Sequence, residues 1–405
     1  MTSTSMPETG KRGEPARGIA LRLILLLGIT SLLGSMVSNG AHSVTGPFLL
    51  SLGGSAAVVG LIAGAGDFIG YALRLITGPV LAKTRYYWTV TIIGYSLLAA
   101  IPLLALAGSW EVAALLIILE RVGKAIRAPS RDSILSHATA EMGRGKGFGI
   151  HKTLDQAGAI TGPLILMAAL LMNGGYSEGF AILGIPLIFM FAVLLFARRL
   201  VPSPDLLEAE PKIRPDNGIN QRIFMPYGVY IFLVMAGFVN FPILSYHLAS
   251  QSPVPVGEIP LLFSIAMLSA GVIAFATGNI YDKKGITLMA LFPIINVIAP
   301  MFIFFFGYTG ILFGIVIWGG SLGMQAMLLR VIIADFTQKQ SRGTAYGIMN
   351  ALFGTAWFIG SMVMGVLYDV SLIHVAAYII IVECLSVPAF IWLLHSRTKS
   401  AGSVT

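Results

Sequence analysis

The chain has 405 residues, of which 56% are hydrophobic and only 11% are charged, and its mean hydropathy is +0.84. A soluble domain carries about 25% charged residues, so these proportions exclude an ordinary water-soluble globule and predict repeated bilayer crossings of about 20 residues each. The single cysteine, Cys384, excludes an internal disulfide and a cysteine-based metal site. The net charge of +8 is interpreted as charge that orients the chain in a membrane, not as a nucleic-acid-binding surface.

Residues 1–18 are polar and basic, and we expect a disordered tail there. A cleaved signal peptide is not expected, because the apolar run that follows is too long and lacks a small-residue cleavage site. Six apolar stretches then predict membrane-spanning helices, over 19–49, 58–82, 88–108, 111–131, 147–172 and 179–200. A polar linker is expected over 201–222. Six further helices are predicted over 223–249, 259–281, 286–307, 310–333, 343–368 and 374–395, before a polar tail over 396–405. The runs are continuous, which favours helices over the alternating strands of a barrel.

Lysine and arginine are confined to alternate loops of this arrangement. Basic residues of the loops on one side are Lys83, Arg85, Arg144, Lys146, Arg198, Arg199, Lys212, Arg214, Arg222, Lys283, Lys284, Lys339 and Arg342. The loops of the other side contain none, but carry Glu111, Glu178, Glu258 and Asp369. Basic loops stay in the cytoplasm, so both termini and the linker are predicted there. The expected fold is an all-α, multi-pass protein of the cytoplasmic membrane, with twelve transmembrane helices in two six-helix bundles, 19–200 and 223–395.

The two halves resemble each other in sequence. At an offset of 198, Arg144-Gly145 aligns with Arg342-Gly343, Phe148-Gly149-Ile150 with Tyr346-Gly347-Ile348, and Gly162 with Gly360. At an offset of 200, Gly78 aligns with Gly278. Repeated halves joined by a cytoplasmic linker are typical of transporters that rock around a site near the bilayer midplane. We therefore expect a substrate site between the bundles.

The segment G-N-I-Y-D-K-K-G, over 278–285, resembles the loop signature of the major facilitator superfamily. The resemblance covers about 19–395 and implies that superfamily's fold. It also implies a gating role for Gly278, Asp282, Lys283 and Gly285, in which the aspartate caps a neighbouring helix and latches one conformation. The first copy of the loop has Ala82 in the aspartate position. The segments around 120–132 and 148–163 are also similar to a prokaryotic branch of the superfamily with few assigned substrates.

The fifth predicted helix resembles the superfamily signature associated with antiporters. Its spacing of Gly149, Gly158, Gly162 and Pro163 fits that signature, although Leu166 and Met167 stand where it ends in two glycines. Arg121 also lies where helix 4 of the family often carries an arginine. From the residues alone, the glycines are expected to be positions where helices approach closely. The resemblance adds that these faces slide during transport.

Charged residues inside predicted spans are costly and indicate function by default. Asp67 and Arg74 are seven residues apart, on one helix face, whereas Glu120 and Lys124 are four apart and can pair. We expect Asp155, Asp67 and Glu120 to carry protons. The substrate is expected to contact Arg121, Arg74, Lys124, Asn39, His42, Asn240, Tyr246, Gln325 and Trp357. Arg127, Arg131 and Asp132 are assigned to gating. The alternative for these charges is a structural network that locks the helices together.

The leading functional hypothesis is a proton-coupled antiporter that exports a small organic solute. The alternative is a proton-coupled symporter that imports an anionic solute, because cations outnumber acids on the first-half helices. A receptor or scaffold that kept the fold is the non-transport alternative. No phosphate-binding loop, Gly-x-Ser-x-Gly or His-Glu-x-x-His motif occurs, so an enzyme is not expected. The expected partners are the solute, protons and the bilayer. A monomer is expected, with no cofactor, metal or nucleic acid.

Overall fold

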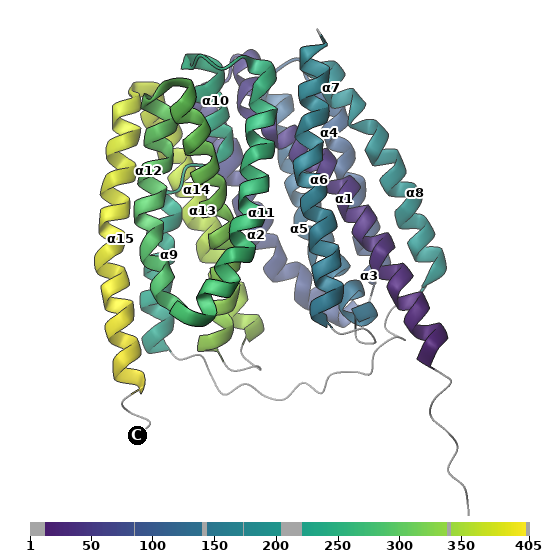
Figure 1. The fold of residues 1–405 in the computed structure, drawn as a ribbon. Coiled ribbons are helices and arrows are strands. Elements are labelled where there is room, and N and C mark those ends of the chain that lie inside the picture. The colour runs from purple at the N-terminus through teal and green to yellow at the C-terminus, as the bar shows by residue number, and fades with distance from the viewer. Residues whose placement is uncertain are drawn as a thin grey trace, which may run out of the picture.

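The computed structural model describes residues 13–84, 86–139, 144–172, 174–203, 221–337 and 342–401. Every regular element in these ranges is a helix. The helices stand side by side, and the start of α1 and the end of α15 lie at the same end of the molecule (Figure 1). Ten stretches of the described residues are long and apolar enough to cross a membrane. The predicted all-α class is therefore confirmed, and the ten candidate spans are consistent with a multi-pass membrane protein.

The first half contains the elements up to residue 200. They are α1 (Gly13–Ser51), α2 (Ala56–Thr84), α3 (Tyr87–Ser96), η1 (Leu97–Ala99), α4 (Ala100–Leu103), η2 (Leu104–Leu106), α5 (Trp110–Thr139), α6 (Arg144–Leu171), α7 (Tyr176–Ile182) and α8 (Gly184–Leu200). The predicted span over 88–108 is thus a run of short helices in one line, α3 to η2. Residues 1–12 of the expected tail and 204–220 of the expected linker lie outside the described residues, whereas 13–18 of the expected tail already belong to α1.

The second half begins at residue 221. Its elements are α9 (Gln221–Gly237), α10 (Phe241–Gln251), η4 (Val256–Glu258), α11 (Ile259–Lys284), η5 (Gly285–Leu291), α12 (Phe292–Phe305), α13 (Gly307–Phe336), α14 (Arg342–Val370) and α15 (Leu372–Ala401). The chain turns between α11 and η5 at Gly285, whose φ of +57° favours glycine. One apolar stretch, Val256–Phe305, therefore contains both α11 and α12.

The predicted helix over 223–249 is interrupted in the middle. It ends as α9 at Gly237 and resumes as α10 at Phe241. Asn240 precedes α10, and its side chain accepts a hydrogen bond from the backbone N–H of Ile243 at 3.2 Å. Pro242 follows in the first turn, where its missing N–H costs nothing. This N-cap and proline explain why a new helix begins here. The break was not predicted from the sequence, because the apolar stretch continues through it.

Glycines bring α1 and α6 into backbone contact. An added Cβ at Gly158 would lie 2.1 Å from the carbonyl oxygen of Leu32, and one at Gly162 would lie 2.1 Å from that of Met36. Gly360, the repeat partner of Gly162, meets the carbonyl of Ala236 on α9 at 2.2 Å. Gly158 and Gly162 thus show the close helix packing expected of them. Gly149 does not, because no heavy atom lies within 4 Å of its Cβ position and it borders a cavity instead.

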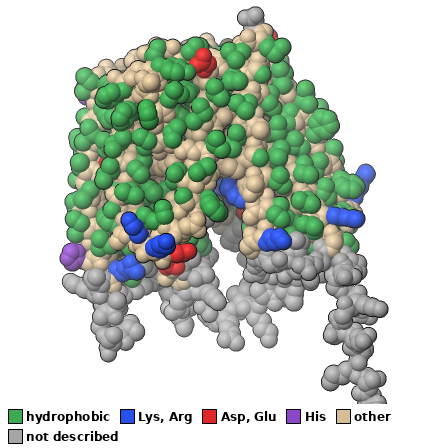
Figure 2. Space-filling model, viewed as in Figure 1, with side chains coloured by type: hydrophobic (Ala, Val, Ile, Leu, Met, Phe, Trp, Pro, Cys, Tyr) green, Lys and Arg blue, Asp and Glu red, His purple; other side chains and the backbone are tan. Residues whose placement is uncertain are grey.

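The two halves are pressed together at the end opposite the start of α1, which we call the closed end. An added Cβ at Gly60 would lie 2.3 Å from the carbonyl of Ser361, and one at Gly46 would lie 2.2 Å from that of Pro242. Asp369 of α14 also accepts hydrogen bonds from the first two N–H groups of α2, each at 2.9 Å. At the other end the halves separate around a hollow, near which basic side chains gather, while apolar side chains cover the flanks (Figure 2).

Candidate functional site

A cavity of about 960 Å³ lies between the two halves. Its first-half wall comes from α1, α2, α3, α5 and α6, and its second-half wall comes from α11 and α13. A smaller cavity of about 160 Å³ shares Ser38, Asn39 and Lys124 with it and continues toward α10. The pair of cavities occupies the place between the bundles where a substrate site is expected.

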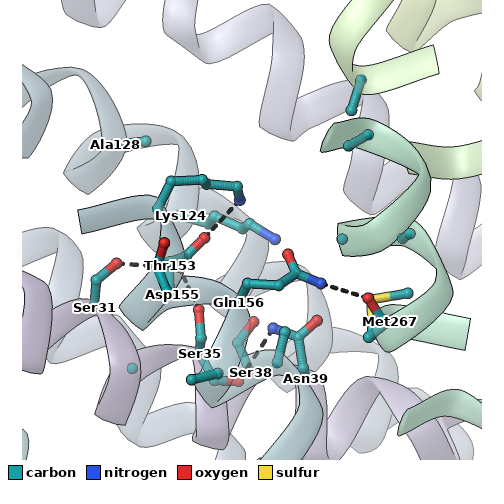
Figure 3. Close-up of a pocket in the computed structure, with 18 of the residues that line it drawn as sticks. Ser31, Ser35, Ser38, Asn39, Lys124, Ala128, Thr153, Asp155, Gln156 and Met267 are labelled. Carbon is teal, nitrogen blue, oxygen red and sulfur yellow. Dashed lines mark hydrogen bonds and ion pairs between the residues drawn. The ribbon is translucent and has the colours of Figure 1, made fainter. Parts of the chain in front are cut away.

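Asp155 lies in the cavity wall, where α6 faces α1. Its Oδ1 accepts hydrogen bonds from the hydroxyls of Ser31 at 3.1 Å and Ser35 at 2.5 Å, and its Oδ2 is 2.8 Å from Nζ of Lys152 (Figure 3). Lys152 is 61% exposed on its side chain, whereas Asp155 is 24% exposed. The carboxylate therefore joins two helices at the cavity surface and keeps access to water.

Glu120 is buried behind the cavity wall. Its Oε1 lies 3.0 Å from Nη2 of Arg127 and accepts a hydrogen bond from the hydroxyl of Ser38 at 2.9 Å. The expected partner was Lys124, one turn away on α5. Arg127 takes that place because it is also buried and reaches back along the helix, two turns, toward Glu120. Arg127 also contacts α3, because its guanidinium carbon lies over the Tyr95 ring, 5.3 Å from the ring centre.

Arg121 lines the smaller cavity. Its Nη1 is 3.7 Å from Oδ1 of Asp67, and its Nε is 3.8 Å from Oε2 of Glu120. Its Nη2 donates to Nδ1 of His42 at 2.7 Å, since a guanidinium has no acceptor. Asp67 is thus brought to Arg121, not to Arg74 on its own helix. The contact requires α2 and α5 to lie side by side, and Gly66 allows it by leaving room for the Arg121 side chain.

Arg131 and Asp132 lie toward the open end of the cavity. Arg131 binds Oδ1 of Asp132 through Nε at 3.1 Å and Nη2 at 2.8 Å. Its Nη1 also donates to the hydroxyl of Ser31 at 3.0 Å, the serine that donates to Asp155. Arg131 therefore links α5 to α1 directly and, through Ser31, to Asp155 of α6, as either a gate or a structural network would.

Two cations of the cavity lack a carboxylate partner among the described residues. Lys124 lines both cavities, and no ion pair or hydrogen bond of its amine occurs in the described part of the chain. Arg74 lines the larger cavity with its guanidinium 5.2 Å from the centre of the Tyr71 ring, and its buried Nε has no hydrogen-bond partner. The carboxylates of the wall are used by Arg121, Arg127, Arg131 and Lys152. The cavity therefore presents uncompensated positive charge.

The second-half wall is neutral. Its lining residues are Met267, Ala270, Gly271, Ala274, Phe275, Leu322, Gly323 and Ala326 in the larger cavity, and Asn240, Phe241, Phe263, Trp318 and Trp357 in the smaller one. Gln156 of α6 crosses from the first half and donates to the carbonyl of Met267 at 2.7 Å (Figure 3). Such a wall suits the apolar or aromatic part of a solute.

Two predicted substrate residues do not line either cavity. Tyr246 packs between the halves toward the closed end, with its ring 5.6 Å from that of Tyr368. Gln325 points into the second bundle, where its Nε2 donates to Ser321 at 3.0 Å. Both residues were predicted to contact the substrate only because they lie in a predicted span. Whether a residue reaches the cavity depends on which face of its helix it occupies. Asn39, His42, Asn240 and Trp357 do line the cavities.

The loop predicted to act as a latch lies at the open end. Asp282 and Lys283 are exposed in the last turn of α11, and Asp282 makes no hydrogen bond or ion pair with another described residue. Gly278 lies near the methyl of Met327, at 3.5 Å from its Cβ position. The helix cap between halves is instead made by Asp369 at the closed end. Asp369 is an ordinary acid of an outer loop in the sequence, so no pattern pointed to it.

Sequence reasoning also missed the uncharged partners of the site. Ser31, Ser35 and Ser38 follow one face of α1 and bind Asp155 and Glu120. Their spacing of three or four residues is a helical signal, but serine is too common for that spacing to be read without the opposing carboxylates. Gln156, beside Asp155, is the other such residue.

Comparison with known proteins identifies relatives along the whole chain. A family model described as Major Facilitator Superfamily matches residues 27–361 and 227–404. An uncharacterized protein of Mycobacterium tuberculosis is 35% identical over 385 residues, which are 93% of this chain and 93% of that protein. An uncharacterized MFS-type transporter of Methanocaldococcus jannaschii is 26% identical over 362 residues, 86% of this chain and 89% of that protein.

Solved structures share the fold at low sequence identity. The nucleoside transporter NupG superposes with a TM-score of 0.71 at 16% identity, over 92% of this chain and 98% of that one. The peptide transporter POT, in complex with sulfate, superposes with a TM-score of 0.75 at 13% identity, over 93% of this chain and 94% of that one. At these identities the likeness concerns the fold alone.

Proposed function

The chain belongs to the major facilitator superfamily, and from this premise we propose that it is a proton-coupled secondary transporter of a small organic solute. The solute would cross the cytoplasmic membrane by alternating access and leave the cell in exchange for protons. The observation that carries the proposal is Asp155, a carboxylate in the wall of a cavity of about 960 Å³ between the two halves.

The proposed topology has twelve crossings in two bundles, with both termini in the cytoplasm. Ten apolar stretches support it, of which Val256–Phe305 contains two helices, α11 and α12. The remaining crossing is α5, whose cavity-lining charges lower its hydropathy. In this orientation the cavity opens to the cytoplasm and the closed end faces outward.

Proton coupling is proposed to act through the contact of α1 with α6. When Asp155 takes a proton, it loses its charge and with it the attraction of Lys152, and it keeps fewer acceptor positions for Ser31 and Ser35. The same two helices touch through Gly158 and Gly162. A change in the charge of Asp155 therefore acts at the α1–α6 contact, which must move during the proposed transport cycle. Asp67 and Glu120, which meet at Arg121, are the further carboxylates proposed for this role.

The test begins with a thermal-shift screen of metabolites and drugs on the purified protein, because the solute is unidentified. A stabilising compound is then followed in liposomes under imposed pH gradients. We expect flux to follow the gradient, and we expect Asp155→Asn to lose gradient-driven flux while counterflow of the solute persists. Glu111→Gln, which removes an exposed carboxylate outside the cavity, is the matched control. Flux that ignores the gradient in the wild-type protein would refute proton coupling.

A second candidate, import of an anionic solute together with protons, is favoured by Lys124 and Arg74. Two cations without carboxylate partners in one cavity would be compensated by an anion, and each charge-assisted hydrogen bond contributes about 1.5–3 kcal/mol. Lys124→Gln is therefore expected to weaken binding of an anionic compound from the screen roughly tenfold to a hundredfold, measured by thermal shift. The exposed Lys284→Gln is the control. Equal loss for anionic and cationic compounds would argue against this candidate.

A further inference from the structure

Glu383 of α15 carries a buried carboxyl and is 1% exposed. In the sequence it lies far from the charged residues that line the cavity. Its Oε1 accepts a hydrogen bond from Nδ2 of Asn296 on α12 at 2.8 Å. It rests against Gly237, the last residue of α9, where an added Cβ would lie 2.7 Å from the same oxygen. The carboxyl thus faces the point where the α9–α10 helix is interrupted.

The surrounding polar groups form a network that is short of donors. Oδ1 of Asn296 accepts from the hydroxyl of Ser321 at 2.8 Å and from Nε2 of Gln325 at 3.4 Å. Two buried oxygens, Oε2 of Glu383 and Oε1 of Gln325, have no hydrogen-bond partner. One further proton in this network would supply a donor that it lacks.

No charged group among the described residues compensates an ionised Glu383. Asn296, Ser321 and Gln325 of α12 and α13 are neutral, and no described cation of α9 or α14 forms an ion pair with the carboxyl. The titratable groups that face it are the hydroxyls of Tyr230 on α9 and Tyr378 on α15. These donate to the carbonyls of Met289 and Ala236, so they do not donate to the carboxyl.

An anion at this place would be doubly unfavourable. A buried carboxylate with one amide hydrogen bond and no opposite charge recovers little of the cost of leaving water. The carboxyl also lies at the C-terminal end of α9, where the helix dipole is negative. A bound proton removes both costs and supplies the missing donor.

We propose that Glu383, hydrogen-bonded by Asn296, whose amide is in turn held by Ser321 and Gln325, is a proton-binding site in the second bundle. A sodium ion fits less well, because the amide of Asn296 already directs an N–H at the carboxyl where a cation would lie. This inference goes beyond the proposed function, which places the coupling carboxylates in the first half. It adds a carboxyl on the opposite side of the cavity.

The site is connected to the cavity through the interruption at 238–240. Phe238 packs between Trp318 and Trp357, with ring centres 5.5 and 5.8 Å away. Both tryptophans line the smaller cavity, and Nε1 of Trp318 donates to the carbonyl of Val239 at 2.8 Å. A solute that moves these rings also moves the chain next to Gly237, so occupation of the cavity alters the surroundings of the Glu383 proton.

The test is infrared spectroscopy of the purified wild-type protein, which needs no solute. We expect a C=O stretching band of a carboxylic acid at neutral pH, shifted in D₂O, that disappears in Glu383→Gln. Glu111→Gln, at an exposed carboxylate, should leave the band unchanged. Should Glu383→Gln not fold, Asn296→Ala is expected to shift the wild-type band to higher wavenumber, because the carbonyl loses its hydrogen bond.

Three results would overturn the proposal. The first is a wild-type spectrum without the band, and the second is a band that persists at full intensity in Glu383→Gln or does not shift in Asn296→Ala. The third is a sodium site: sodium chloride, but not potassium chloride, would raise the melting temperature of the wild type, with no effect in Glu383→Gln and no acid band. None of these results depends on whether the protein transports protons, so the proposed function is tested separately.

Discussion

The charged side chains of the first half are held by partners on other helices. Glu120 joins Arg127 and Ser38, Asp155 joins Ser31 and Ser35, and Asp67 joins Arg121. Charges inside predicted spans could be recognised from the sequence because they are costly there. Their partners could not be recognised from the sequence. A residue three or four positions away on the same helix is only one possible partner, since packed helices also bring residues of other helices close. Lys124 and Arg74 are left for the cavity by this pairing.

The buried pair of Glu120 and Arg127 gives a prediction for stability at the residue scale. Arg127→Gln leaves Glu120 buried without its nearest cation, which is expected to cost about 3–5 kcal/mol and to lower the melting temperature in detergent. Arg199→Gln, which removes an exposed arginine at the end of α8, is expected to change little. Equal melting temperatures for the two variants would contradict the structural role of the pair.

Among the elements, α1 and α6 depend on backbone contact. Gly158 and Gly162 of α6 face the carbonyls of Leu32 and Met36, whereas Gly149 of the same helix faces the cavity. The glycine spacing was visible in the sequence, and so was the family signature that includes all three. Which glycine touches a helix depends on the crossing of α1 and α6, and no spacing in one helix contains that information.

This difference within one helix provides a matched pair of substitutions. Gly162→Ala places a Cβ 2.1 Å from the carbonyl of Met36 and is expected to cost about 1–3 kcal/mol by forcing α1 and α6 apart. Gly149→Ala meets no heavy atom within 4 Å and is expected to fold as the wild type does. Thermal unfolding and the yield of monodisperse protein measure both. A Gly149→Ala defect as large as that of Gly162→Ala would show that packing is not the reason.

At the scale of the whole molecule, the two halves meet at the closed end through a helix cap and close backbone contacts. Asp369 of α14 binds the first two N–H groups of α2, where the positive end of the helix dipole favours a carboxylate. Gly60 and Gly46 bring the backbones of the halves together beside it. The proposed alternating access requires these contacts to open, so Asp369 is expected to stabilise the arrangement with the cavity at the other end.

Labelling of a cysteine at the closed end measures this closure. In a Cys384→Ser background, Ser245→Cys places a thiol where α10 meets Gly46. Asp369→Ala removes a cap that contributes about 1 kcal/mol, so labelling by a membrane-impermeant thiol reagent is expected to become roughly fivefold faster. Glu258→Gln, at an acid of the same end whose partner Tyr308 lies in the same half, is the control. An unchanged rate with Asp369→Ala would exclude a closing role.

The sequence by itself determined that the chain is a helical membrane protein with repeated halves, because apolar length, basic loops and glycine spacing are local properties. It also indicated most of the charged residues in the cavity. The tertiary structure alone decided the partners, because pairing depends on which helix faces meet: Arg127 for Glu120, the α1 serines for Asp155, and Asp369 for α2. Glu383 illustrates the limit, since a single acid in the last helix became a candidate site only when Gly237, Asn296 and Gln325 were placed around it.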